Sequence, residues 1–204
     1  ENLEREVESK AGISKGSLNG KLQQLEAPLV ASKRVYDKVL VAERKKDSSF
    51  DEMVDSIPMI KSLHSQLTQP SNNLDTTYAQ ARVVKEAMGK HFKDRWGDAA
   101  IIPELKDRAD AERKIEDKYF GKKNEIKDIF RCTLKFSLFK EVFEGWTFLE
   151  EMKEIKILNV KNKFKNPDVL GYADININAG FKLEDGTYHI FEIQLHLNAI
   201  LVAK

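Results

Sequence analysis

The pair Asp185-Gly186 separates two segments, 173–183 and 187–196, in which apolar and polar residues alternate. Asp-Gly is favoured in the turn of a β-hairpin, because glycine accepts the positive φ angles that such turns need. Alternation with a period of two sends successive side chains to opposite faces of a strand. The segment therefore predicts an antiparallel hairpin, and such a sheet buries its apolar face against another layer.

The segments before and after the hairpin add two strands and two helices. Residues 127–136 are rich in β-branched and aromatic residues and predict a strand, and 154–162 predicts another. Residues 138–152 carry apolar side chains at helical spacing, and Asn198 begins a final helix. The order predicts an α+β fold with a mixed, mostly antiparallel sheet of four to five strands and flanking helices. Its expected core is Ile129, Leu134, Phe136, Ile155, Ile157, Ile175, Ile177, Phe181, Ile190, Ile193 and Leu195.

The first half of the chain predicts helices instead. Pro28 and Pro58 lie inside two of them and predict a kink or a split. We divide the chain into a helical region of unknown role, 1–100, and an α+β region, 101–204. The predicted helices are 18–45 with Ser17 as N-cap, 50–67, 75–95 closed by Gly97, and 104–120 opened by Pro103 and closed by Gly121.

Composition limits the classes of site. The formal net charge is +1, so a site for a polyanion has to come from local clustering. Cys132 is the single cysteine, which excludes an intramolecular disulfide and a multi-cysteine zinc site and fits the cytoplasm. An effector acting in the cytosol of a host cell fits equally well. No apolar run is long enough to span a bilayer, and we expect a fragment of a longer protein, truncated at its C-terminal end.

Two clusters of basic residues are candidate anion sites. Lys161, Lys163 and Lys165 alternate, so on a strand they project together and suit a phosphate chain; a solvated edge that discourages aggregation is an equally good explanation. The helix 104–120 is dense in both charges, and a solvent-facing, salt-bridged helix is the favoured explanation there. Its charged residues include Lys106, Arg108, Arg113, Lys114, Lys118, Asp107, Asp110, Glu112, Glu116 and Asp117.

Two acidic residues lie on predicted strands, Asp128 at the start of one and Glu192 among apolar neighbours in another. Carboxylates on neighbouring strands could hold Mg²⁺ together with substrate phosphates, whereas a Glu on a half-solvated strand is the structural alternative. The four histidines lack the spacing of metal ligands, and no glycine-rich phosphate loop is present. Nucleotide binding would need another design.

These motifs, in this order, resemble the synthetase domain of the RelA/SpoT family over about 104–204. The family has a lysine, a proline six residues later and Gly-Tyr four residues after that, and Lys161, Pro167, Gly171 and Tyr172 keep this spacing. Its Glu-Ile-Gln corresponds to Glu192-Ile193-Gln194, and its strand opening with Asp-Ile to Asp128-Ile129. An Arg and a Lys ten residues apart on an upstream helix correspond to Arg108 and Lys118.

The resemblance implies a nucleotidyltransferase-like fold and transfer of pyrophosphate from ATP to a hydroxyl of a nucleotide or an RNA, with Mg²⁺ as cofactor. Asp128 and Glu192 would be catalytic and would hold the metal, Tyr172 would stack on the acceptor base, and Gln194 would support the site. Asn176 and His196 stand where the family has His and Arg, and are included with the nucleotide-binding candidates. The remaining candidates for binding phosphates are Arg108, Lys118, Lys161, Lys163 and Lys165.

Two alternatives stay open from the sequence. A non-catalytic descendant would bind a nucleotide or RNA with the same basic cleft, because a fold does not guarantee its usual chemistry. An interaction module would use the helices of 18–95 to bind a protein partner, with the α+β region as scaffold. No membrane association is expected in any of the three cases.

Overall fold

A six-stranded sheet in the order β1-β4-β5-β6-β3-β2 forms the centre of the molecule. The computed structural model describes residues 15–203, with side chains from residue 30 onward. Neighbouring strands are antiparallel except β3 and β6, which are parallel, so the predicted α+β fold is confirmed. The strands are β1 (Ile60–Lys61), β2 (Ala100–Ile101), β3 (Arg131–Phe136), β4 (Ile155–Asn162), β5 (Ile175–Lys182) and β6 (Tyr188–Leu197).

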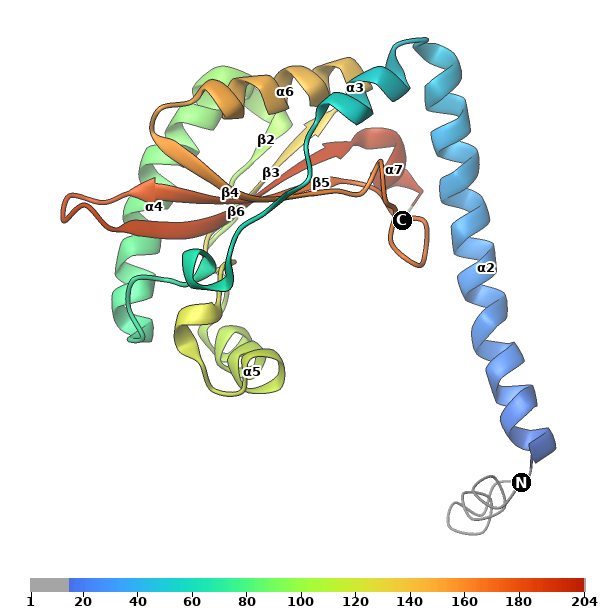
Figure 1. Ribbon diagram of the computed structural model, residues 1–204, viewed down its shortest axis with the longest axis horizontal. Coiled ribbons are helices and arrows are strands. Elements are labelled where there is room, and N and C mark those ends of the chain that lie inside the picture. Colours follow the sequence, from blue (N-terminus) through green and yellow to red (C-terminus); the bar gives the residue numbers. More distant parts are fainter. Residues whose placement is uncertain (1–14, 204) are drawn as a thin grey trace.

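The helices lie on both sides of this sheet and at one end of it. In Figure 1, α3 and α6 run along one side, α5 lies on the opposite side, and the long α2 stands at the end of the sheet beside α7. No helix in the described part of the chain is apolar over enough of its length to cross a membrane. The helices are α2 (Lys15–Lys46), α3 (Phe50–Ser56), α4 (Leu74–Trp96), α5 (Arg108–Tyr119), α6 (Phe139–Glu151) and α7 (Asn198–Val202), with 3₁₀ turns at His64–Leu67, Gly97–Ala99 and Lys123–Glu125.

The apolar face of the sheet packs against α4 and α6, as the period-two alternation predicts. Leu134 and Phe136 of β3 and Leu195 of β6 belong to the same buried cluster as Trp146 of α6. Gly145 lets α6 approach closely, because a Cβ there would stand 3.0 Å from the Phe136 ring. The predicted core is buried apart from Ile157 and Phe181, which are half-buried.

The predicted hairpin and several predicted boundaries are confirmed. Gly186 has φ 84° between β5 and β6, and Gly97 closes α4 with φ 53°. Leu183 and Thr187 face each other across the turn, where the Leu183 amide donates to the Thr187 carbonyl at 2.8 Å. The predictions of α6 and of a helix beginning at Asn198 also hold.

The predicted split at Pro58 is confirmed, but the predicted helix 50–67 is wrong beyond Ser56. Ile57 has the extended angles φ −78° and ψ 112°, because the residue before a proline is disfavoured in the α region. After Pro58 the chain pairs with β4 as β1 and then forms the 3₁₀ turn His64–Leu67. The proline thus converts an apolar helical pattern into an edge strand.

Two helix starts also differ from the prediction. Ser17 lies inside α2 rather than at its N-cap, and the helix continues through Pro28, since one lost hydrogen bond leaves the rest of a 32-residue helix intact. The helix α5 begins at Arg108 rather than after Pro103. The Asp107 side chain caps it by accepting from the amides of Ala109 and Asp110.

The strand predicted over 127–136 begins only at Arg131, so Asp128 lies in the segment that leads into β3. The carbonyl of Ile129 accepts from the Lys106 amide at 2.9 Å instead of joining the sheet ladder. The division at residue 100 stays a prediction; the same buried cluster includes Phe92 of α4 and Leu134 of β3.

Candidate functional site

The face of the sheet opposite α6 carries a grid of polar side chains. Residues paired across neighbouring strands share a face, so the register of the strand pairs places these side chains in rows. One row runs through Arg131, Glu192, Asn178 and Asn159, and the next through Thr133, Gln194, Asn176 and Lys161. On β3 and β6 a third row pairs Lys135 with His196. Strand pairing thus brings Glu192, Gln194, Asn176 and Lys161, all predicted site residues, onto one surface.

A chain of hydrogen bonds crosses this face from Tyr172 to Glu192. The Gln194 amide Nε2 donates to Glu192 Oε1 at 2.8 Å, so Gln194 presents its carbonyl Oε1 to His196 Nε2 at 3.2 Å. We assign the proton of His196 to Nε2, the nitrogen that faces the Gln194 carbonyl, and Nδ1 then pairs with the Tyr172 hydroxyl at 2.9 Å; the Tyr172 hydroxyl is also hydrogen-bonded to Asp174. The predicted residues Tyr172, His196, Gln194 and Glu192 are linked in this order.

Asp128 is buried between two lysines. Its Oδ2 lies 3.2 Å from Lys106 Nζ and its Oδ1 lies 2.8 Å from Lys114 Nζ, and the residue is 8% exposed. Burial is the largest single influence on the pKa of Asp128 and by itself would raise it, but the two lysines together outweigh it and lower the pKa. Asp128 is therefore ionised at neutral pH despite its burial.

Asp128 and Glu192 both lie close to the end of α5. The Glu192 amide donates to the carbonyl of Phe130, two residues beyond Asp128, at 3.2 Å. Burial, followed by the negative charges of Asp128, Glu125 and Glu192, raises the pKa of Tyr119 to about 12. Both carboxylates therefore raise the pKa of the Tyr119 hydroxyl. That Asp128 and Glu192 hold one metal ion between them stays a prediction.

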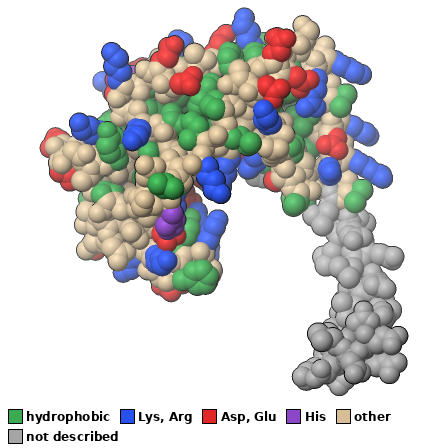
Figure 2. Space-filling model, in the orientation of Figure 1, with side chains coloured by type: hydrophobic (Ala, Val, Ile, Leu, Met, Phe, Trp, Pro, Cys, Tyr) green, Lys and Arg blue, Asp and Glu red, His purple; other side chains and the backbone are tan. Residues whose placement is uncertain are grey.

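Two cavities open next to these residues. The larger, of about 750 Å³, is lined by Tyr172, Gln194 and His196 together with Lys163 and Asp174. The smaller, of about 220 Å³, is lined by Asp128 with Lys106 and Asp107. Arg131 lines both cavities. Figure 2 shows that the molecule is hollowed between the part that holds α5 and the part against which α2 packs, with Lys and Arg side chains along the wall.

The three alternating lysines do not stay on one strand. The strand β4 ends at Asn162, so Lys161 lies on the polar face while Lys163 and Lys165 follow in a turn. Lys163 Nζ lies 3.0 Å from Asp174 Oδ1 and 5.2 Å from the centre of the Tyr172 ring. Lys165 Nζ pairs with Asp55 of α3 at 2.7 Å.

Lys161 also belongs to a group of four basic residues around α5, with Lys114, Lys118 and Lys127. Burial is the main cause that lowers the pKa of Lys127, and the positive charges of Lys114, Lys118 and Lys161 lower it further. Lys114 and Lys127 also lie over the Tyr119 ring, at 5.9 and 5.5 Å from its centre. The predicted residues Lys118 and Lys161 therefore belong to one positive field next to Asp128.

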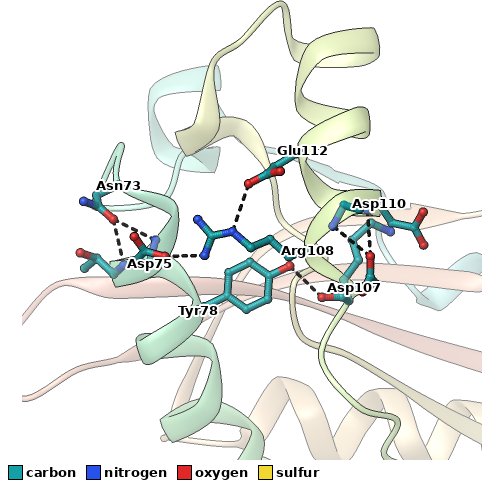
Figure 3. A network of polar contacts seen from close by, with 10 residues as sticks. Asn73, Asp75, Tyr78, Asp107, Arg108, Asp110 and Glu112 are labelled. Carbon is teal, nitrogen blue, oxygen red and sulfur yellow. Dashed lines mark hydrogen bonds and ion pairs between the residues drawn. The ribbon is translucent and has the colours of Figure 1, made fainter.

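Arg108 lines neither of the two cavities, and its guanidinium is held by acidic residues (Figure 3). Its guanidinium pairs with Asp75 of α4 and with Glu112 Oε1 at 3.0 Å, and it lies over the Tyr78 ring at 5.9 Å. The hydrogen bonds from Arg108 to Asp75 and Glu112 raise the pKa of Arg108. In this arrangement Arg108 joins α4 to α5.

The charged helix is only partly the solvent-facing helix that the sequence favours. Arg108–Glu112 and Arg113–Asp110 are exposed pairs of that kind. Lys114 of the same helix, and Lys106 just before it, instead compensate the buried Asp128. The direction in which the Lys106 and Lys114 side chains point depends on how α5 packs, and the local charge pattern does not determine this packing.

Sequence reasoning missed Arg131, Thr133 and Lys135 as residues of the site. All three lie on the polar face of β3 and line the larger cavity. Their alternation with the buried Cys132 and Leu134 was the available signal. Cys132 is buried, which excludes it as an accessible nucleophile.

The carboxylates of Asp128 and Glu192 are ligands of the type that Mg²⁺ binds. Mg²⁺ prefers oxygen ligands and commonly takes one or two carboxylates, completing its shell with water and phosphate oxygens. Among the described residues, no three His, Cys, Asp or Glu side chains gather closely enough to hold a metal by themselves. Asp128 and Glu192 therefore fit Mg²⁺ only as part of a site that nucleotide phosphates complete.

The fold is shared with solved structures of alarmone synthetases. No protein-family model matches the chain, and no curated protein matches it. Small alarmone synthetase 2 from Bacillus subtilis is 17% identical, with a TM-score of 0.55 over 63% of this chain and 74% of that one. Small alarmone synthetase 1 from the same organism, bound to its product pppGpp, is 15% identical, with a TM-score of 0.50 over 62% and 71%.

A GTP pyrophosphokinase family protein from Streptococcus pneumoniae gives a similar result. It is 14% identical, with a TM-score of 0.50 over 63% of this chain and 70% of that one. At such identities the likeness concerns the fold alone. Over somewhat less than two thirds of its length, the chain is folded like these synthetases.

Proposed function

We propose that the chain transfers a pyrophosphate group from ATP to a hydroxyl of an acceptor nucleotide, in a reducing cytosol. One observation carries the proposal: Glu192 is fixed by Gln194 beside the lead-in to β3, where Asp128 is surrounded by lysines. This arrangement provides an ordered carboxylate for the acceptor hydroxyl and positive charge for a chain of phosphates. The shared fold with pyrophosphate-transferring enzymes supports the same conclusion.

The reaction requires one bond to form and one to break. The acceptor oxygen forms a bond to the β-phosphorus of ATP, the bond from that phosphorus to the oxygen bridging to the α-phosphate breaks, and AMP leaves. The proton of the acceptor hydroxyl passes to the Glu192 carboxylate. Gln194, by donating to Glu192 Oε1, keeps that carboxylate oriented for the transfer.

The basic residues on the α5 side would bind the donor. Lys118 and Lys161 belong to the positive field around Tyr119, and Arg131 joins the two cavities. We assign to them the phosphates of ATP, with Arg131 next to the group in transfer. Arg108 and Lys165 would reach a phosphate only by exchanging their acidic partners for it.

The acceptor would occupy the larger cavity. Tyr172 would stack on its base, with Lys163 near the ring and Gln194 and His196 forming polar contacts. Asn176 stands beside Gln194 on the polar face and would contribute a further polar contact. A cavity of about 750 Å³ lies within the range of ordinary small-ligand sites.

Magnesium would be held by Asp128 and Glu192 together with the phosphates of ATP. When bound, it would supply positive charge against the negative charge that develops on the transferred group. Lys106 and Lys114 already hold Asp128 in its ionised form, which is the form that a metal requires.

Thin-layer analysis with γ-labelled ATP tests the proposal. The purified chain would be incubated with Mg²⁺ and with guanine nucleotides, adenine nucleotides or RNA as acceptors. Label moving to a nucleotide with release of AMP supports the proposal, and label on RNA would change the acceptor class. Binding of ATP without AMP release identifies a binding module, and release of inorganic phosphate alone would contradict pyrophosphate transfer. Protein binding through the helices of 18–95 stays a prediction.

A further inference from the structure

The helix α2 presses on the Gly171-Tyr172 segment of the larger cavity. Gly171 has φ +85°, and a Cβ at this position would stand 3.2 Å from Tyr36 Cβ and 3.3 Å from Lys33 Cα. The backbone of α2 therefore lies in direct van der Waals contact with the glycine. A glycine is needed here both for the positive φ and for this close approach.

Tyr36 transmits this contact to Tyr172. The Tyr36 ring is 6% exposed and meets the Tyr172 ring edge to face, with 5.8 Å between ring centres and an angle of 81°. Tyr36 and Ser32 also line the larger cavity. The wall of this cavity is thus completed by a helix that lies at the end of the sheet (Figure 1).

The contact continues from Tyr172 to Glu192. The Tyr172 hydroxyl bonds to His196, His196 to Gln194, and Gln194 to Glu192. Gln194 has one carbonyl and one amide group to place, so with its carbonyl toward His196, and toward Thr133 Oγ1 at 3.4 Å, its amide nitrogen faces Glu192. A ring displaced at Tyr172 would therefore disturb the acceptor wall first and the Glu192 carboxylate second.

We infer that α2 is a positioning element of the acceptor site: Tyr36 fixes the ring of Tyr172, and Tyr172 fixes Glu192 through His196 and Gln194. Tyr36 acts through Tyr172 and is a positioning residue rather than a catalytic one. The inference rests on the proposed function for its kinetic part, and its structural part stands without it.

The structural part is tested by amide hydrogen exchange in the full chain. Tyr36→Leu removes the ring and keeps an apolar side chain, whereas Tyr36→Phe keeps the ring. Faster exchange over 171–174 in Tyr36→Leu, with exchange near the wild-type rate in Tyr36→Phe, is the expected result. Val35→Ala, at an exposed neighbouring position, is the matched control. Unchanged exchange in a folded Tyr36→Leu protein would overturn the inference, whatever the activity.

The kinetic part is tested with the acceptor that the labelling assay identifies. In Tyr36→Leu the KM for the acceptor should rise about 2- to 10-fold, the range expected for an aromatic pair, while the KM for ATP stays unchanged. His196→Phe should mainly lower kcat, with partial recovery in His196→Gln. Equal effects on both KM values would contradict a role at the acceptor wall. An inactive wild type would refute the proposed function and leave the exchange test valid; if Tyr36→Leu does not fold, Tyr36→Met, which also removes the ring and keeps an apolar side chain, provides the same test.

Discussion

The Gln194 amide nitrogen lies 2.8 Å from Glu192 Oε1, so the carboxylate that we assign to the chemistry is oriented by a side chain two residues along the same strand. Alternation places both on the polar face of β6, and pairing with β3 and β5 continues that face onto the neighbouring strands. This relationship is the basis for the first prediction.

Gln194→Leu should lower kcat about 10-fold or more while leaving the KM for ATP unchanged, because a hydrogen bond to a charged group contributes about 1.5–3 kcal/mol. Steady-state kinetics with ATP as the varied substrate provides the measurement. Gln66→Leu makes the same chemical change at an exposed position in a 3₁₀ turn and should have wild-type kinetics. An unchanged kcat in Gln194→Leu would remove the orienting role.

Lys114→Met should destabilise the chain by about 1–3 kcal/mol at pH 7, because it leaves the buried Asp128 carboxylate with one lysine. Asp128→Asn in the same background should recover part of this loss, since the uncompensated charge is then absent. The measurement is urea unfolding of the two single variants and the double variant. Additive losses would show that the two side chains do not interact.

The same pair predicts an acid dependence. The folded-state pKa of Asp128 lies below its ordinary value of 3.8, so the stabilisation is complete above that value and is lost as the pH falls through the lower folded-state pKa. In Asp128→Asn this component of the acid dependence should be missing. Urea midpoints at pH 7 and pH 3 for both proteins provide the comparison, and equal losses would contradict the assignment.

His189 predicts a second pH range, above that of Asp128, in which the stability of the fold depends on pH. It is fully buried, neither ring nitrogen has a hydrogen-bond partner among the described residues, and burial lowers its pKa from 6.5 to about 4. Between these values the unfolded chain binds the proton that the folded chain does not, so stability falls as the pH falls from 6.5. The loss reaches about 3 kcal/mol by pH 4.

The measurement is urea unfolding between pH 7 and pH 4. His189→Phe should flatten this part of the stability curve, and Tyr188→Phe, at the exposed neighbouring position, should keep the wild-type slope. If stability in His189→Phe changed between pH 7 and pH 4 as steeply as in the wild type, the pH dependence in this range would be due to other groups.

Arg131→Gln should raise the KM for ATP and lower kcat, because its guanidinium lines both cavities next to Glu192. Arg131→Lys should recover part of the ATP affinity and less of kcat, since lysine keeps the charge but loses the planar, bidentate geometry. Calorimetric titration with a non-hydrolysable ATP analogue separates binding from turnover. Equal ATP affinity in wild type and Arg131→Gln would exclude contact with the donor.

Local patterns were sufficient for much of the fold. The turn at Gly186, the C-cap at Gly97 and the apolar face of α6 are each set by residues close in sequence, and each was predicted. Alternation alone predicts that Ile193 and Leu195 are buried on one face of β6 while Glu192 and Gln194 lie on the opposite, polar face. The prediction of a helix beyond Ser56 was wrong, because Pro58 and the pairing of β1 with β4 outweigh the helical spacing of the apolar residues there.

The site depended on contacts between distant segments, which the sequence pattern does not determine. Alternation could group Glu192 with Gln194, but only the parallel pairing of β6 with β3 places Arg131 beside Glu192. The partners of Asp128 come from α5 and from the segment before it. Because the charge pattern of that region is typical of a solvent-facing helix, it did not predict that Lys106 and Lys114 pair with a buried carboxylate. The prediction of three aligned lysines failed at Lys163 and Lys165, because β4 ends at Asn162, before both of them.

Pyrophosphate transfer is tested most directly by measuring AMP and labelled acceptor in the same reaction, with wild type beside Glu192→Gln. The proposed function predicts equal amounts of the two products from the wild type, and loss of both in a Glu192→Gln protein that still binds ATP. AMP without labelled acceptor, or undiminished transfer by Glu192→Gln, would contradict it.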